Sequence, residues 1–242
     1  MAVGDRGEGT RLAALTGAWI CFEDEAGQAL QPGRARTWAP RGHAKECAPL
    51  WTGAMSSGGN TTAVVAGGIV YVGTVYSGVY AFGAAGTTNC STRTTAKTCA
   101  PLWNAPMNGA DALAVANGVV FVAANATLYA LDAGAPQNCP GTGTSRTCSR
   151  TPLWSSAADV PVDSGPWLTV ANGVVYITSG NGGIDAYDAA GSQNCSISGT
   201  VKTCTPLWDH AIGFAGGGSP VIVSGVLFVN APGNRDVYAF SP

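Results

Sequence analysis

The sequence predicts an all-β fold made of four copies of one unit, and three observations support this. A Pro-Leu-Trp motif recurs along the chain, and its tryptophans lie 52, 51 and 54 residues apart. Each interval contains two apolar, β-branched runs joined by a two-residue turn. Charged residues make up only 11% of the chain while glycine occurs 34 times, a composition typical of short strands and tight turns. The tryptophans are Trp51, Trp103, Trp154 and Trp208.

The first two runs of each unit predict a hairpin. In the second unit, residues 113–116 and 119–122 flank the dipeptide Asn117-Gly118. This dipeptide indicates a type I′ turn, because both of its central residues need a positive φ. The equivalent turns are Gly67-Gly68, Asn172-Gly173 and Ser224-Gly225. The runs are continuous rather than alternating, so we expect these strands to be buried on both faces.

A third run follows, and it carries an alanine at the same position in every unit. We expect this small residue to leave room for the tryptophan of a neighbouring unit. These alanines are Ala81, Ala130, Ala186 and Ala239. The Pro-Leu-Trp motif then begins a fourth strand.

Four antiparallel strands in a repeat of about 50 residues predict the blades of a β-propeller, with four blade-equivalents in this chain. Two arrangements stay open. The strand that begins at Trp51 could complete the last blade and close a four-bladed ring, or the chain could be a fragment of a larger propeller.

The first 46 residues depart from the repeat. They hold all four glutamates and six of the twelve lysines and arginines. We therefore divide the chain into an atypical segment, 1–46, which we expect to be disordered or foreign to the repeat, and the propeller repeats, 47–242. The segment shows no apolar stretch after a basic start, so we expect no signal peptide in it. No run of about 18 apolar residues occurs, so we expect no transmembrane segment.

Three pairs of cysteines recur with the spacing C-x8-C between the third and fourth strands. They are Cys90 and Cys99, Cys139 and Cys148, and Cys195 and Cys204. Identical pairs in equivalent loops predict three local disulfides, each worth roughly 2.5–3 kcal/mol at most. Metal binding is the rival interpretation, but C-x2-C spacing and nearby histidines are missing. A Cys21–Cys47 bond stays open. Disulfides favour an extracytoplasmic or secreted location.

Segments 116–122 and 128–133, followed by a tryptophan strand, resemble the PQQ-like (pyrroloquinoline quinone-type) β-propeller repeat over about residues 47–242. With C-x8-C loops, the resemblance is to secreted bacterial proteins. It implies either a non-catalytic scaffold that binds a protein or small molecule, or a dehydrogenase using PQQ and Ca²⁺. Such enzymes carry adjacent cysteines, a catalytic aspartate and Glu or Asn ligands for calcium. This chain has no Cys-Cys dipeptide and no glutamate in the repeats, which favours the scaffold and no cofactor.

No catalytic or metal-binding constellation is recognisable, and we nominate two ligand contacts. Trp167 precedes an inner strand, where the other units have no aromatic residue. Asp185 replaces the tyrosine found at positions 80, 129 and 238, although chance variation at a partly exposed position would explain it too. The net charge of −2 and the lack of a basic patch argue against a nucleic-acid partner.

Overall fold

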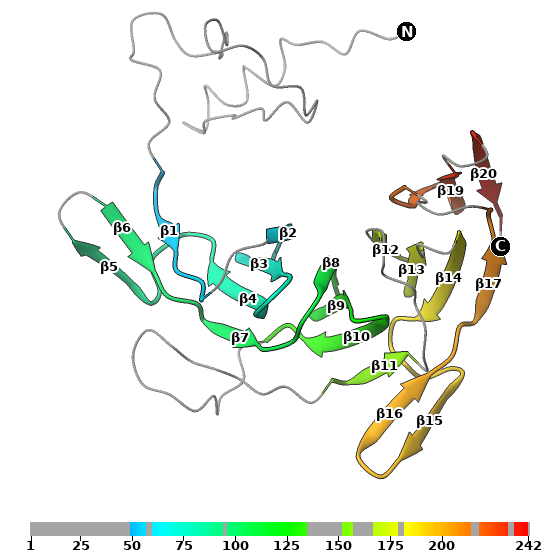
Figure 1. Cartoon of the computed structure of the whole chain (residues 1–242), viewed down its shortest axis with the longest axis horizontal. Helices are drawn as coiled ribbons and strands as arrows, with labels where there is room; N and C mark the ends of the chain where they lie inside the picture. Colours follow the sequence, from blue (N-terminus) through cyan, green and yellow to red (C-terminus); the bar gives the residue numbers. More distant parts are fainter. Residues whose placement is uncertain are drawn as a thin grey trace, which may run out of the picture. The chain divides into compact units, whose positions relative to one another are not determined.

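The computed structural model describes residues 49–56, 60–93, 96–134, 152–156, 167–178, 182–213, 218–231 and 235–241. These residues belong to one unit, Pro49–Pro242, and form strands without any helix (Figure 1). The described part accordingly holds no helix with the length and apolar character needed to span a membrane. The all-β prediction is confirmed for these residues. Segment 1–46, the Cys21–Cys47 pairing and the Cys139–Cys148 bond lie outside the described residues.

The strands form successive antiparallel sheets, each built in chain order (Figure 1). The first sheet contains β2 (Asn60–Ala66), β3 (Ile69–Thr74), β4 (Gly78–Gly83) and β7 (Trp103–Ala105). The second contains β8 (Ala110–Ala116), β9 (Val119–Ala124), β10 (Thr127–Asp132) and β11 (Trp154–Ser156). The third contains β12 (Trp167–Ala171), β13 (Val174–Thr178), β14 (Gly183–Asp188) and β17 (Trp208–Ala211). The last has three strands, β18 (Val221–Val223), β19 (Val226–Ala231) and β20 (Asp236–Phe240).

The predicted hairpin turns are present. Asn117 and Gly118 have φ values of 50° and 75°, and Asn172 and Gly173 have 51° and 78°. Ser224, at 51°, adopts the same conformation without an amide side chain. Positive φ at both central positions gives the turn the twist of the flanking strands. The tryptophan motif also begins the fourth strand of a sheet, as predicted, at β7, β11 and β17.

The cysteine loops are short hairpins. Cys90 and Cys99 form a disulfide across β5 (Cys90–Arg93) and β6 (Ala96–Cys99), and Cys195 and Cys204 form one across β15 (Cys195–Ser198) and β16 (Val201–Cys204). The prediction of these two disulfides is confirmed.

The position of these hairpins was not predicted. Strand β16 lies parallel to β11, with Ser155 paired to Thr203, so the hairpin of the third unit extends the second sheet. In the same way β6 lies parallel to β1 (Thr52–Gly53), the short strand after Trp51. Each described hairpin therefore joins its own unit to the tryptophan strand of the unit before it.

Consecutive sheets pack face to face. We call the face that packs on the following sheet the back face, and the face that packs on the preceding sheet the front face. At the second junction, Phe121, Leu128 and Trp154 from the back face meet Val175, Ile177 and Tyr187 from the next front face. Equivalent positions meet at the first junction: Tyr71, Val79 and Trp103 with Val120, Val122 and Leu131. The third junction contains Tyr176, Ile184, Leu227, Val229 and Phe240.

A tryptophan marks each junction. The ring of Trp154 lies 6.0 Å from that of Tyr187 in the next sheet, and Trp208 lies 5.0 Å from Phe240. The repeated alanine has a different role from the one predicted. Ala130 lies directly opposite Trp154 within the same sheet, so it accommodates the indole of its own unit. Ala81 and Ala186 face Trp103 and Trp208 in the same register.

The indole of each of two tryptophans, Trp154 and Trp51, packs directly against a glycine of the next sheet. Gly191 has a φ of 63°, and a Cβ atom there would lie 2.3 Å from Cδ1 of Trp154. The indole Nε1 donates a hydrogen bond to the carbonyl oxygen of Ala189 at 3.2 Å. Gly86 lies under Trp51 in the same way, at 2.2 Å. The side chain is missing here because the indole occupies its place.

Replacing Gly191 by alanine therefore tests the junction. We expect Gly191→Ala to lower the free energy of unfolding by about 3 kcal/mol, since it adds overpacking to the strain of a left-handed residue. The matched control is Gly199→Ala, whose φ is 62° and whose added Cβ would meet nothing within 4 Å. That change should cost only about 1 kcal/mol. Urea unfolding measures both values, and equal losses would contradict the packing argument.

Candidate functional site

Consecutive sheets share one orientation, which places equivalent ends together. Strand β2 lies beside β8, and β8 lies beside β12. The Thr62 hydroxyl donates to the carbonyl oxygen of Asp111 at 3.4 Å, and the Thr169 hydroxyl donates to that of Pro220 at 2.5 Å. Each bond joins nearly equivalent positions in adjacent units. We call the end at which the first strands begin the leading end of the sheets.

Two exposed aromatic side chains lie at the leading end. Trp167 begins β12 and is 47% exposed. Tyr76 lies in the turn between β3 and β4 and is 71% exposed. The sequence predicts Trp167 as a ligand contact, whereas Tyr76 was not predicted. The sequence did contain a signal for Tyr76. This aromatic residue lies in a turn, and the equivalent turn of the second unit, Asn125-Ala126, has no aromatic residue.

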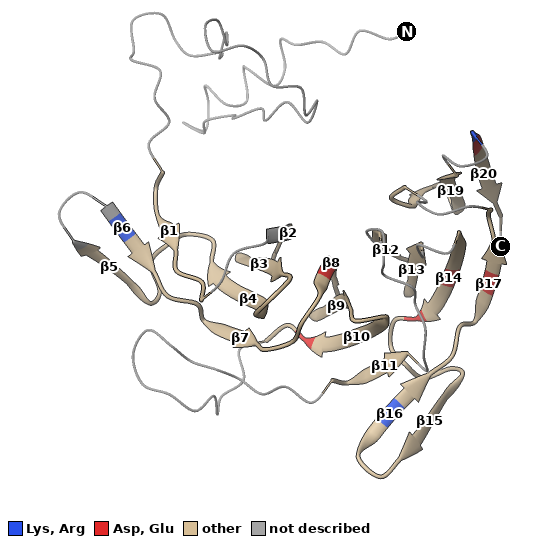
Figure 2. Ribbon diagram, in the orientation of Figure 1, with Lys and Arg blue, Asp and Glu red and all other residues tan. Residues whose placement is uncertain are grey.

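Asp185 lies directly opposite a second carboxylate. It is on β14, and its partner in the register is Asp209 on β17; Figure 2 shows acidic residues on both strands. Burial raises the pKa of Asp185, and the negative charge of Asp209 raises it further, to about 6. Like charges in direct cross-strand pairs are unfavourable.

The other units avoid this repulsion at the same position. Tyr80 faces Asn104 in the first sheet, and Tyr129 faces Ser155 in the second. The paired carboxylates are therefore a feature of the third unit alone among these three sheets.

The carboxylate pair lies near further polar side chains in the junction between the second and third sheets. Tyr187 lies two residues along β14 on the same face, and its hydroxyl shares a hydrogen bond with Ser156. Burial raises the pKa of Tyr187, and the charges of Asp185 and Asp209 add to this, against the hydrogen bond from Ser156. Ser156 also accepts a hydrogen bond from the backbone N–H of Leu128 at 3.0 Å. Burial and the charge of Asp209 let Asp185 hold its proton up to about pH 6.

The two nominated ligand contacts do not share a face. Asp185 stands in a cross-strand row with Ile177, which packs on the second sheet. Trp167 stands in the neighbouring row with Thr178 and Ile184. Neighbouring rows of a sheet point to opposite faces. Trp167 and Asp185 therefore cannot act together on one ligand in the same sheet, and their individual roles as ligand contacts stay predictions.

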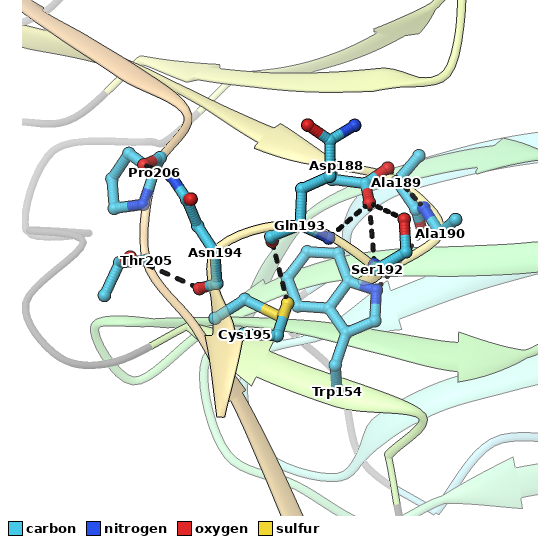
Figure 3. Close-up of a disulfide and its surroundings, with 11 residues drawn as sticks. Trp154, Asp188, Ala189, Ala190, Ser192, Gln193, Asn194, Cys195, Thr205 and Pro206 are labelled. Carbon is cyan, nitrogen blue, oxygen red and sulfur yellow. Dashed lines mark hydrogen bonds between the residues drawn. A yellow bond between two sulfur atoms is a disulfide. The ribbon is translucent and has the colours of Figure 1, made fainter. Parts of the chain in front are cut away.

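Another buried carboxylate has a structural role. Asp188 accepts hydrogen bonds from the backbone N–H groups of Ala190, Ser192 and Gln193 at 3.1, 2.7 and 2.9 Å (Figure 3). Burial alone would raise the pKa of Asp188, but these bonds and that from the Ser192 hydroxyl outweigh it and lower the pKa. The carboxylate shapes the loop that places Gly191 under the indole and leads into the disulfide hairpin.

Comparison with known proteins identifies the fold only. No family model matches the chain, and no curated protein matches its sequence. The computationally designed Ika4 protein is 12% identical, with a TM-score of 0.53 over 80% of this chain and 99% of Ika4. BamB from Moraxella catarrhalis is 20% identical, with a TM-score of 0.43 over 67% of this chain and 43% of BamB. The designed Ika8 protein is 13% identical, with a TM-score of 0.41 over 76% of this chain and 58% of Ika8.

The raised pKa of Asp185 predicts that the free energy of unfolding depends on pH. Because its folded pKa of about 6 exceeds the ordinary aspartate pKa of 3.8, the folded state binds the proton more tightly than the unfolded chain. The free energy of unfolding should therefore fall as pH rises from about 4 to about 6, and then level off. Asp185→Asn should remove this fall and add about 1–2 kcal/mol of stability at pH 7, allowing for partial exposure.

Urea unfolding at a series of pH values measures this effect. Asp209→Asn is the matched control, since it removes the repulsion but leaves Asp185 buried, and it should weaken the pH dependence without abolishing it. An Asp185→Asn variant with the pH dependence of the original chain would contradict the assignment.

Proposed function

We propose that this chain is a β-propeller with PQQ-like repeats, and that it binds a partner outside the cytoplasm without catalysing a reaction. The observation that carries the proposal is the repeated junction between sheets. Four successive antiparallel sheets follow one another in chain order, with the first strands of the first three side by side, as the blades of a propeller are arranged. The similarity to Ika4 supports the fold.

The leading end of the sheets is the proposed binding surface. It presents Tyr76 and Trp167, which are 71% and 47% exposed. Tyrosine and tryptophan are enriched where proteins bind one another, because each buries a large area at a small cost in conformational entropy. Most other aromatic side chains of the first three sheets are used within the junctions.

The disulfides support a location outside the cytoplasm. Cys90–Cys99 and Cys195–Cys204 occupy equivalent hairpins, so the bond belongs to the repeat. Such bonds persist in oxidising compartments and are reduced in most cytoplasms. We therefore propose that the chain is secreted.

The binding surface is tested by changing the two exposed rings. We expect Tyr76→Ala and Trp167→Ala to reduce, by at least about tenfold, the amount of partner captured from the extracytoplasmic fraction of the producing organism. Ile197→Ala is the matched control, because Ile197 is 72% exposed on the distant hairpin strand β15. Tyr76→Ala and Ile197→Ala should leave stability within about 0.5 kcal/mol, and Trp167→Ala should cost about 1–2 kcal/mol because Trp167 is about half buried, so capture is compared at a temperature where all variants are folded. Equal capture by all variants would refute the surface.

The alternative implied by the resemblance is a dehydrogenase with PQQ and Ca²⁺. Calcium takes about six to eight oxygen ligands, several of them carboxylates. Within the described ranges, no group of three or more His, Cys, Asp and Glu side chains is placed to hold a metal ion. The described first strands, β2, β8, β12 and β18, carry one carboxylate, Asp111. The residues described do not fit the cofactor.

A spectral titration decides between these functions. We expect PQQ added with Ca²⁺ to give no saturable change in absorbance or in tryptophan fluorescence. Saturable binding that also requires Ca²⁺ would favour the dehydrogenase and contradict the proposed function.

A further inference from the structure

The last sheet leaves its back face open. At the internal junctions, the third-strand residues of the back face are fully buried, each at 0% exposure: Val79, Leu128 and Ile184. Their equivalent in the last sheet, Val237, is 71% exposed. Phe228 is 38% exposed, whereas its equivalent in the second sheet, Phe121, is 1% exposed. Side chains that cover the following sheet elsewhere are therefore uncovered on β19 and β20.

The first sheet leaves its front face hollow. Val70 and Val72 are only partly buried, whereas their equivalents Val120 and Val122 have no exposed surface. A cavity of about 270 Å³ lies over this face. Its lining is Trp51, Gly53, Met55, Thr62, Ala63, Val70, Val72 and Phe82. The hollow occupies the place that the back face of a preceding sheet fills at the internal junctions.

Strand β1 already marks where that preceding sheet would lie. The ring of Trp51 lies 5.9 Å from that of Phe82, and its Nε1 donates to the carbonyl oxygen of Ala84 at 3.1 Å. These contacts match those of Trp154 with Tyr187 and Ala189. Strand β1 therefore takes the position of a fourth strand, and in the described chain it is paired only with β6.

The last sheet has the complementary gap. Among the described residues, its strand order is β18-β19-β20, without a tryptophan strand. In the other three sheets the third-strand alanine faces the tryptophan, as Ala130 faces Trp154. The same register would place Ala239 opposite Trp51 and Tyr238 opposite Thr52.

We propose that two copies of this chain assemble through these faces. Strand β1 of each copy completes the last sheet of the other, and Phe228 and Val237 of that sheet fill the hollow over Val70 and Val72. The new junction repeats the three junctions inside the chain. The inference goes beyond the proposed function, because it does not depend on what the protein binds.

A second copy is the occupant that the structure favours. Both faces belong to one chain, and within the described part of that chain both stay open. A two-fold pair gives each β1 a β20 and each β20 a β1, so both junctions form at once and no further copy can add. The pair contains eight sheets, within the range of about four to eight blades found in propellers. It also removes an exposed apolar sheet face and edge, which isolated proteins avoid.

Sedimentation equilibrium of the full chain is the first test. We expect twice the mass of 24.3 kDa. Val237→Glu should raise the dissociation constant at least tenfold, because it buries a charge at the junction, which corresponds to at least about 1.4 kcal/mol. The matched control is Ile197→Glu, since Ile197 is 72% exposed on β15 and belongs to neither open face. A monomer at every concentration, or a Val237→Glu chain that pairs as before, would overturn the proposal.

Mixed cross-linking is the second test, and it separates two copies from closure of one. Chains carrying Thr52→Cys are mixed with chains carrying Tyr238→Cys and oxidised. We expect a reducible band at twice the mass of the chain, absent when the original chain is oxidised alone. A chain carrying both substitutions that links only to itself would show ring closure within one copy and overturn the proposal. Neither test uses a ligand. A failure of the proposed pairing can therefore be told apart from a failure of the proposed binding function.

Discussion

The contact between a tryptophan and the following sheet is the interaction on which the rest of this structure depends. Trp154 lies against Tyr187, donates a hydrogen bond to Ala189 and occupies the space above Gly191. Within its own sheet the indole needs a small neighbour, which Ala130 supplies. One side chain thus sets the residue opposite it, the residue beneath it and the distance to the next sheet. Because the motif repeats, the same geometry recurs at Trp51.

The disulfide hairpins reinforce this contact from outside. Each closes a loop of about ten residues, so its entropic contribution is modest. Its placement has the larger effect, because β16 pairs with β11 and thereby attaches the third unit to the second. The backbone of the hairpin base is also held, since Asn194 donates from its side chain to the carbonyl oxygen of Pro206 at 2.9 Å (Figure 3). Two sheets are consequently joined both through apolar faces and through strand pairing.

Against this regular background, a few positions depart from the repeat in ways that packing between the sheets does not require. Replacing a tyrosine by Asp185 opposite Asp209 introduces repulsion that the first two sheets avoid. Tyr76 and Trp167 leave large rings in water, while most rings at the junctions are buried. These positions are separate: the carboxylates lie at a junction and the rings at the leading end. The chain therefore combines a repetitive scaffold with a few positions that the scaffold does not require.

The sequence by itself determined the repeated strands that carry the apolar runs and the tryptophan motif, the turn conformation and the pairing of the described cysteines. These signals act over a few residues, as at Asn117-Gly118, or recur at equivalent positions, as with Cys195 and Cys204. Only the tertiary structure decided that each hairpin extends the preceding sheet, that Trp167 and Asp185 point to opposite faces, and that Val237 is uncovered. The physical reason is that strand register and the packing of sheets depend on contacts between units. A repeat pattern specifies the structure within each unit, but it does not specify which neighbouring unit packs against it.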